Sequence, residues 1–163
     1  MGTGDTAQIS ATAKAQATRP ASPQFNNSYF ERLNAMPRAD MAVLVGKDAD
    51  ALSASQGLPS GQYDFTSLTT GQAWLVTYNL KNNLGAPLDA IVAFDTNIPT
   101  NCDDATVYNM VEPIKSSAQY EKEAGNAGTA DWLRAALTMM ATFSADKALD
   151  GPYGLYNPVS QSK

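Results

Sequence analysis

Residues 72–95 read Gln72-Ala-Trp-Leu-Val-Thr-Tyr-Asn-Leu-Lys-Asn-Asn-Leu-Gly-Ala-Pro-Leu-Asp-Ala-Ile-Val-Ala-Phe-Asp95, and they carry the clearest periodic signal in the chain. From residue 74 a large side chain recurs at every second position, and residues 88–95 alternate in the same way. A turn rich in Asn, Gly and Pro joins the two segments. Two segments of period two around such a turn predict a β-hairpin. Its core face is expected to comprise Trp74, Val76, Tyr78, Val92 and Phe94.

The segments around this hairpin predict an α+β domain with a small antiparallel β-sheet. A short apolar run at 41–45 indicates a buried strand, and residues 48–56 indicate a helical turn that a glycine stops. Tyr63 and Phe65 indicate a strand before the hairpin, and residues 107–111 indicate one after it. The 72–95 hairpin is therefore expected to be the centre of the sheet.

Two segments carry helix boundary signals, and both helices are expected to pack on or beside the sheet. Near 28–36, Ser28 and Glu31 have the spacing of a capping box. Near 129–149, Thr129 is a candidate N-cap, the apolar residues follow helical spacing, and a Gly-Pro pair blocks continuation.

The composition divides the chain into three parts. Residues 1–25 are expected to be an extended N-terminal arm, because Ala, Thr, Ser and Gln dominate it and Ile9 is its only large aliphatic residue after Met1. Such a segment buries too little apolar surface to offset the entropy of ordering it alone. Residues 26–150 are expected to form one domain, and residues 151–163 a Gly/Tyr/Pro-rich tail.

The charge distribution argues against nucleic acid as a partner. Eleven basic residues face sixteen acidic ones, which gives a net charge of −5. Residues 1–38 hold four basic and two acidic residues, so a mildly basic arm precedes an acidic body. Phosphate-binding proteins concentrate Lys and Arg instead. No apolar run is long enough to cross a membrane, so we expect no membrane partner either.

Candidate catalytic groups are few. The chain has one cysteine and no histidine, so the commonest general base is absent. Ser144 and Lys147 match the Ser-x-x-Lys pattern of acyl-transfer enzymes, but its companion motifs are missing, and two exposed residues near a helix end explain it better. Carboxylates such as Glu112 and Asp131 offer a pair for glycoside hydrolysis, although any acidic protein contains such pairs.

One loop is a candidate cation site. Oxygen-bearing side chains crowd the segment after the hairpin, and oxygen ligands suit Ca²⁺. Asn and Asp are also ordinary turn residues, and the spacing is not that of an EF-hand, so a turn is the favoured interpretation and no cofactor is predicted. The oxygen-bearing residues are Asp95, Asn97, Asn101, Asp103 and Asp104.

These features favour a non-enzymatic structural subunit of a multi-copy assembly. The expected setting is a virion, such as a bacteriophage capsid decoration or head–tail protein assembled in the host cytoplasm. Its partners would be copies of itself or other subunits such as a capsid protein. Alternatives are a soluble acidic binding or effector protein in the cytoplasm, and a small hydrolase. The predicted partner-binding residues are Ile9, Arg19, Phe25, Tyr153, Leu155 and Tyr156.

Overall fold

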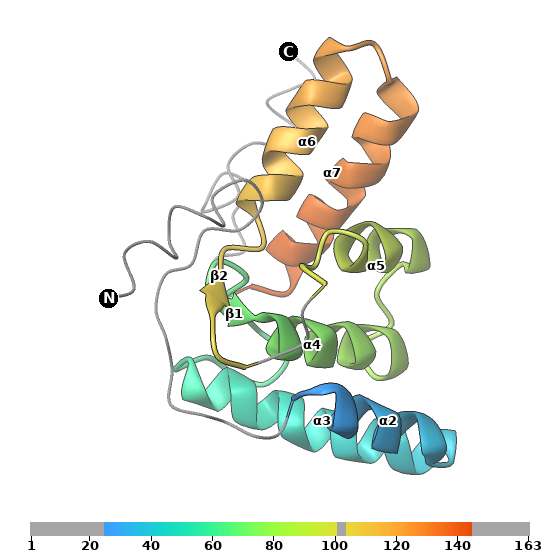
Figure 1. The fold of residues 1–163 in the computed structure, drawn as a ribbon, viewed down its shortest axis with the longest axis vertical. Coiled ribbons are helices and arrows are strands. Elements are labelled where there is room, and N and C mark those ends of the chain that lie inside the picture. Colours follow the sequence, from blue (N-terminus) through green and yellow to red (C-terminus); the bar gives the residue numbers. More distant parts are fainter. Residues whose placement is uncertain (1–24, 101–103, 145–163) are drawn as a thin grey trace.

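The computed structural model describes residues 25–100 and 104–144 of the chain. These ranges contain six helices and one pair of two-residue strands, joined by loops (Figure 1). In chain order they are α2 (Asn27–Ala35), α3 (Arg38–Ser55), β1 (Leu68–Thr69), α4 (Thr70–Asn82), α5 (Leu88–Asp95), β2 (Val107–Tyr108), α6 (Glu112–Glu123) and α7 (Ala127–Thr142). The α+β prediction is therefore wrong, because the described domain is mainly helical.

Helix α4 lies at the centre of the domain. It packs against α3 on one side and α5 on the other. Helix α5 packs against α7, and α6 forms an antiparallel pair with α7 (Figure 1). The α6–α7 pair extends away from the α2–α3 pair, with α4 and α5 between them (Figure 1).

The predicted hairpin at 72–95 is wrong, because these residues form α4 and α5. Almost every side of α4 is covered: Ala73, Leu75, Val76 and Leu80 are all fully buried. A helix buried on most sides has apolar residues at many spacings, so alternate positions are apolar by coincidence. The predicted turn is real, but it joins two helices, with Gly85 at a φ of 67°.

The apolar run at 41–45 lies inside α3, so the predicted strand there is also wrong. Val45 is buried while Val43 is 74% exposed, a difference that follows helical rotation. The helix predicted over 48–56 is the second half of α3. Gly57, at a φ of 74°, ends it as predicted. Its N–H donates to the carbonyl of Ala54, and the next N–H donates to that of Ser53, the paired bonds of a Schellman motif.

The two predicted helices exist with different boundaries. Helix α2 confirms the helix near 28–36, but its N-cap is Asn26, whose side chain accepts from the Tyr29 N–H, and not Ser28. The helix predicted over 129–149 is α7, which begins after Asn126 and ends at Thr142. Residues 145–149 lie outside the described residues.

The only regular strands in residues 25–100 and 104–144 are very short. Leu68 pairs with Tyr108 and Thr69 with Val107 in antiparallel register. The strand predicted over 107–111 is thus limited to its first two residues. Residues 63–65, also predicted as a strand, do alternate in burial but form no strand pair. Their backbone hydrogen bonds go to two separate residues: the Tyr63 N–H donates to the Phe143 carbonyl, and the Phe65 carbonyl accepts from the Met110 N–H.

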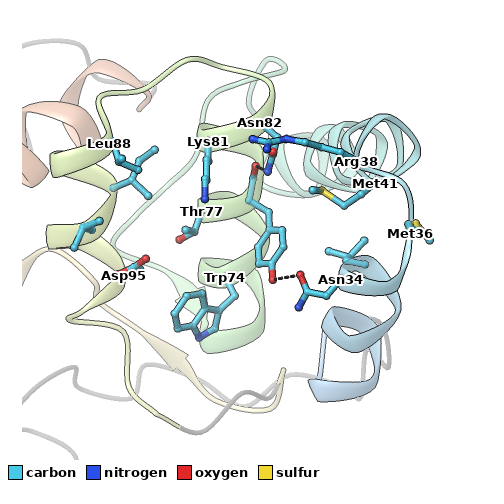
Figure 2. Close-up of a pocket in the computed structure, with 14 residues that line it drawn as sticks. Asn34, Met36, Arg38, Met41, Trp74, Thr77, Lys81, Asn82, Leu88 and Asp95 are labelled. Atoms are coloured by element: carbon cyan, nitrogen blue, oxygen red, sulfur yellow. Dashed lines mark hydrogen bonds between the residues drawn. The ribbon is translucent and has the colours of Figure 1, made fainter.

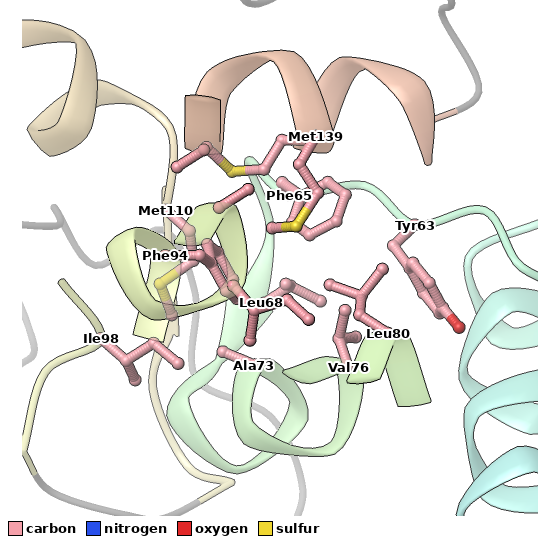
Figure 3. Packing of buried hydrophobic residues seen from close by; sticks show 14 of the residues in the cluster. Tyr63, Phe65, Leu68, Ala73, Val76, Leu80, Phe94, Ile98, Met110 and Met139 are labelled. Atoms are coloured by element: carbon pink, nitrogen blue, oxygen red, sulfur yellow. The ribbon is translucent and has the colours of Figure 1, made fainter. Parts of the chain in front are cut away.

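The core gathers where α4, α5 and α7 meet this irregular segment. Tyr63 contacts Phe65 edge to face, and Phe65 in turn contacts Phe94 of α5 in the same geometry. Figure 3 shows Met139 of α7 above this group and Leu80 of α4 below it. Met139 and Met140 of α7 are both buried in this core.

Candidate functional site

A groove of about 480 Å³ lies between α5 and the α2–α3 pair, with α4 as its floor (Figure 2). This volume falls within the range of about 300–1,000 Å³ that is usual for binding pockets. The floor is formed by Trp74, Thr77 and Tyr78 of α4, one helical turn apart or adjacent. The walls come from the end of α2, the start of α3 and one face of α5. We call this feature the α2–α5 groove.

The wall of the groove on α5 carries exposed aliphatic side chains. Helix α5 buries Ile91 and Phe94 with two alanines, which leaves Leu88 62% exposed and Val92 41% exposed. These two residues are four apart, so they lie one above the other on the same helical face. Together with Trp74 they give the groove an apolar wall and part of its floor. Large exposed aliphatic side chains beside a concave surface are typical of a binding site.

The opposite wall supplies two methionines. Met36 and Met41 are partly buried and flank the α2–α3 connection, which is where Pro37 separates the two helices. Methionine is flexible and adapts its shape to an apolar partner. The wall is thus able to repack around a bound side chain.

Polar groups surround this apolar centre. The Tyr78 hydroxyl donates to Asn34 Oδ1 at 3.1 Å, as Figure 2 shows. Arg38 and Lys81 place positive charge on the rim, and Asp95 places a carboxylate at the end of α5. Burial raises the pKa of the Asp95 carboxyl above its ordinary value, while a hydrogen bond from Thr96 and the charge of Lys81 act in the opposite sense. The groove therefore offers both donors and an acceptor around an apolar centre.

Hydrogen bonds hold the wall formed by α2 in place. The Tyr29 hydroxyl donates to Asp48 Oδ2 of α3 at 2.7 Å, and the Arg32 guanidinium lies 5.6 Å from the centre of the Tyr29 ring. Burial, followed by the hydrogen bond to the Asp48 carboxylate, raises the pKa of Tyr29 far above its ordinary value. Helix α2 is thus tied to α3 beside the groove, not only packed on it.

A second polar network joins α3 to α4. Asn79 Nδ2 donates to the buried hydroxyl of Tyr63 at 2.8 Å, and Asn83 Nδ2 donates to Asn79 Oδ1 at 2.7 Å and to the Ala42 carbonyl at 2.9 Å. Buried polar groups of this kind require partners, so the network fixes the position of α4 against α3. The floor of the groove therefore has a defined position relative to its wall.

A second cavity, of about 510 Å³, lies on the other side of α5. It is lined by the α4–α5 turn, by Asp89 and Ala90 of α5, and by the last turns of α7, including Met139 and Phe143. It presents few polar groups and no exposed large aliphatic side chain. The α2–α5 groove is therefore the stronger candidate site of the two.

The point at which the predicted arm joins the domain is closely packed. The Phe25 N–H donates to Asp104 Oδ2 at 3.2 Å, and the Thr69 hydroxyl donates to Asp104 Oδ1 at 2.7 Å. A Cβ at Gly71 would lie 1.9 Å from the Phe25 carbonyl oxygen, so a side chain there is excluded. Phe25 itself packs edge to face on Tyr29. The root of the arm is thus fixed to the start of α4.

The candidate catalytic residues do not converge where the structure describes them. Ser144 is buried, not exposed as expected, and its hydroxyl donates to the Ala141 carbonyl at 3.4 Å, while Lys147 lies outside the described residues. Glu112 pairs locally with Lys115, and Asp131 with Arg134. These local pairs, one in α6 and the other in α7, stabilise their own helices.

The described oxygen-bearing residues of the candidate cation loop lie in two separate places. Asp95 and Asn97 lie at the end of α5, while Asp104 contacts Thr69 at the start of α4; Asn101 and Asp103 lie outside the described residues. Within the described ranges, no group of three or more acidic, Cys or His side chains is able to hold a metal ion.

Of the six predicted partner-binding residues, only Phe25 is described, and it packs on its own domain. Ile9, Arg19, Tyr153, Leu155 and Tyr156 lie outside the described residues. The sequence interpretation missed the α2–α5 groove because it assigned Trp74 and Val92 to the hairpin core. Helical spacing of Leu88, Ile91 and Val92 would have indicated an amphipathic helix at this position.

No family model matches the chain, and neither a curated protein nor a solved structure matches it. Among the helices of the described ranges, none has the length and apolar character needed to cross a membrane.

Proposed function

We propose that this chain is a structural subunit of a multi-copy assembly and that the α2–α5 groove binds a segment of a neighbouring subunit. The observation that carries the proposal is the exposure of Leu88 and Val92 beside the half-buried Trp74 in one concave surface. Protein interfaces are enriched in aromatic residues, Met and Arg, and their strongest contacts are aromatic or apolar anchors in a pocket. The groove combines these residue types.

A virion is the assembly that the sequence favours. A small domain flanked by an Ala/Thr/Ser-rich arm and a Gly/Tyr/Pro-rich tail suits a particle in which each subunit contacts several neighbours. Individually weak contacts become strong when many form at once. In this proposal Ile9 and Arg19 of the arm supply additional contacts, and the partners are copies of this chain or a capsid protein.

The proposal is tested by removing the exposed aliphatic side chains. We expect the full chain to self-associate with increasing concentration in sedimentation velocity, and Leu88→Ser with Val92→Ser to weaken this association at least about tenfold. Leu88 is 62% exposed and Val92 is 41% exposed, so the thermal midpoint should fall only slightly. The matched control is Val43→Ser, which removes an even more exposed aliphatic side chain of α3 that does not line the groove.

Two results would contradict the proposal. One is a full chain that stays monomeric up to its solubility limit and also fails to join particles when it is mixed with candidate capsid proteins. The other is equal association of the groove variant and the Val43→Ser control. The alternative, a soluble binding protein, requires the groove to bind a different protein while the chain itself remains a monomer.

A further inference from the structure

The chemistry of the α2–α5 groove specifies what it is able to bind. Trp74, Leu88 and Val92 offer apolar surface, while Arg38, Lys81 and Asp95 lie around it. An aliphatic side chain alone would leave these rim groups without new partners. A tyrosine supplies both an apolar ring and a hydroxyl that donates and accepts hydrogen bonds. The groove therefore favours a segment that contains tyrosine with an aliphatic residue.

The chain contains one such segment outside the described residues. Residues 1–24 hold no aromatic residue and only Met1 and Ile9 as large apolar side chains. Residues 145–163, in contrast, place Tyr153, Leu155 and Tyr156 within four positions. Glycine or proline at 151, 152 and 154 disfavours a helix, so these side chains are not expected to be buried in a regular element of their own.

Ser144, the last described residue, lies at the end of α7, away from the α2–α5 groove. Helix α7 packs on the face of α5 that carries Asp89 and Ala90, whereas the groove lies on the face that carries Leu88 and Val92. At 100° per residue, these two faces point about 130° apart. The described chain therefore ends on the far side of α5 from its own groove.

The geometry points to the segment 153–156 of a second copy of this chain as the occupant of the α2–α5 groove. This inference rests on the proposed function, because it names the partner of the same site. Eight residues, 145–152, connect Ser144 to Tyr153, and the nine steps between the two Cα atoms span at most about 30–32 Å when extended. That reach allows the segment to leave its own domain and enter the groove of a neighbour.

Such a contact joins two different surfaces, a donated segment and a groove. Heterologous contacts of this type propagate, and they produce a closed ring or an open chain of subunits. Each copy then donates one segment and accepts one. This is the connectivity that a multi-copy assembly requires.

The experiment uses two full-length variants that are each defective in one half of the contact. The groove variant carries Leu88→Ser and Val92→Ser, and the segment variant carries Tyr153→Ser, Leu155→Ser and Tyr156→Ser. We expect each variant alone to associate at least about tenfold more weakly than the unchanged chain in sedimentation velocity. An equimolar mixture should form a 1:1 heterodimer and nothing larger, because only one groove and one segment remain intact. Val43→Ser serves as the control and should leave the association unchanged, because Val43 is exposed and does not line the groove.

The other outcomes are distinguishable. If the groove variant dissociates while the segment variant still assembles, this inference is overturned and the proposed function stands. If neither variant weakens the association, both the inference and the groove's proposed role are overturned. To test docking within one chain, Trp132→Phe leaves Trp74 as the only tryptophan. The segment variant is then compared with the unchanged segment in this background. A difference in Trp74 fluorescence that is the same at all protein concentrations would indicate docking within one chain and would also overturn the inference.

Discussion

At the scale of single residues, Gly71 is the position where the packing allows least change. A Cβ there would lie 1.9 Å from the Phe25 carbonyl oxygen and 2.8 Å from Asp104 Oδ1. Because the first contact is with backbone, the start of α4 and the root of the arm would have to separate. The glycine is therefore required by close approach and not by its backbone angles.

We expect Gly71→Ala to lower the free energy of unfolding by about 2–3 kcal/mol, the usual cost of forcing atoms into a filled site. The control is Gly128→Ala in the first turn of α7, where a Cβ would meet nothing within 4 Å. There alanine should stabilise the protein by up to about 1 kcal/mol through its helix propensity. Urea denaturation measures both values. Equal effects of the two substitutions would contradict this account of Gly71.

The raised pKa of Tyr29 predicts how the free energy of unfolding changes at alkaline pH. Its pKa is raised in the folded state, while in the unfolded chain it is about 10. Above pH 10 the folded state therefore retains a proton that the unfolded state loses, and stability falls as the pH rises. At neutral pH the full contribution of the hydrogen bond to Asp48 is present.

Tyr29→Phe should therefore lower the free energy of unfolding by about 1–3 kcal/mol at pH 7, since the Asp48 carboxylate loses its donor. The difference between the variant and the unchanged chain should shrink as the pH rises above 10. Thermal melts from pH 7 to pH 11 provide the measurement. A difference that stays constant over this range would show that the Tyr29 hydroxyl does not keep its proton in the folded state.

At the scale of elements, α4 depends on its N-terminal cap. The Thr69 hydroxyl accepts from the Gln72 N–H, and the Gln72 side chain accepts from the Thr69 N–H, which completes a capping box. The same hydroxyl donates to Asp104. One side chain thus connects the helix start, the short strand pair and the root of the arm.

Thr69→Ala should cost about 1–2 kcal/mol, as the loss of an N-cap commonly does. Thr69→Ser keeps the hydroxyl and should cost well under half as much. Circular dichroism melts of the two variants give the comparison. If serine is as damaging as alanine, packing of the Thr69 methyl group, and not the cap, stabilises the start of α4.

The elements also show what sequence reasoning was able to predict. The presence of α2 and α7 was predicted correctly from apolar spacing, and so was the helix stop at Gly57. The predicted N-caps were wrong: Asn26 and Asn126 occupy these positions, not Ser28 and Thr129. Helix α4 was missed because burial on most sides removes the helical pattern of apolar residues. Helix α5 was missed because its alternating apolar residues were interpreted as the second arm of a hairpin, although they also fit helical spacing. Helix α6 was missed although Glu112 and Pro113 are typical first-turn residues.

At the scale of the whole molecule, apolar spacing and helix boundary residues could not predict the α2–α5 groove. Its walls come from α2, α3, α4 and α5, so it exists only once those helices pack together. Sequence reasoning did identify the aromatic segment 153–156 as a candidate contact, from its composition alone. The packing of α7 on the other face of α5 places the last described residue away from the groove, and we propose that the segment of a second copy binds there.

The central claim is that the α2–α5 groove binds another copy of this chain, and cross-linking between copies tests it most directly. A photoreactive residue introduced as Leu88→benzoylphenylalanine, in an equal mixture of ¹⁴N- and ¹⁵N-labelled chains, reports which copy is captured. The account predicts mixed-isotope peptides that join residue 88 to residues 151–159. Cross-links confined to one copy, or the same yield from Val43→benzoylphenylalanine, would contradict it.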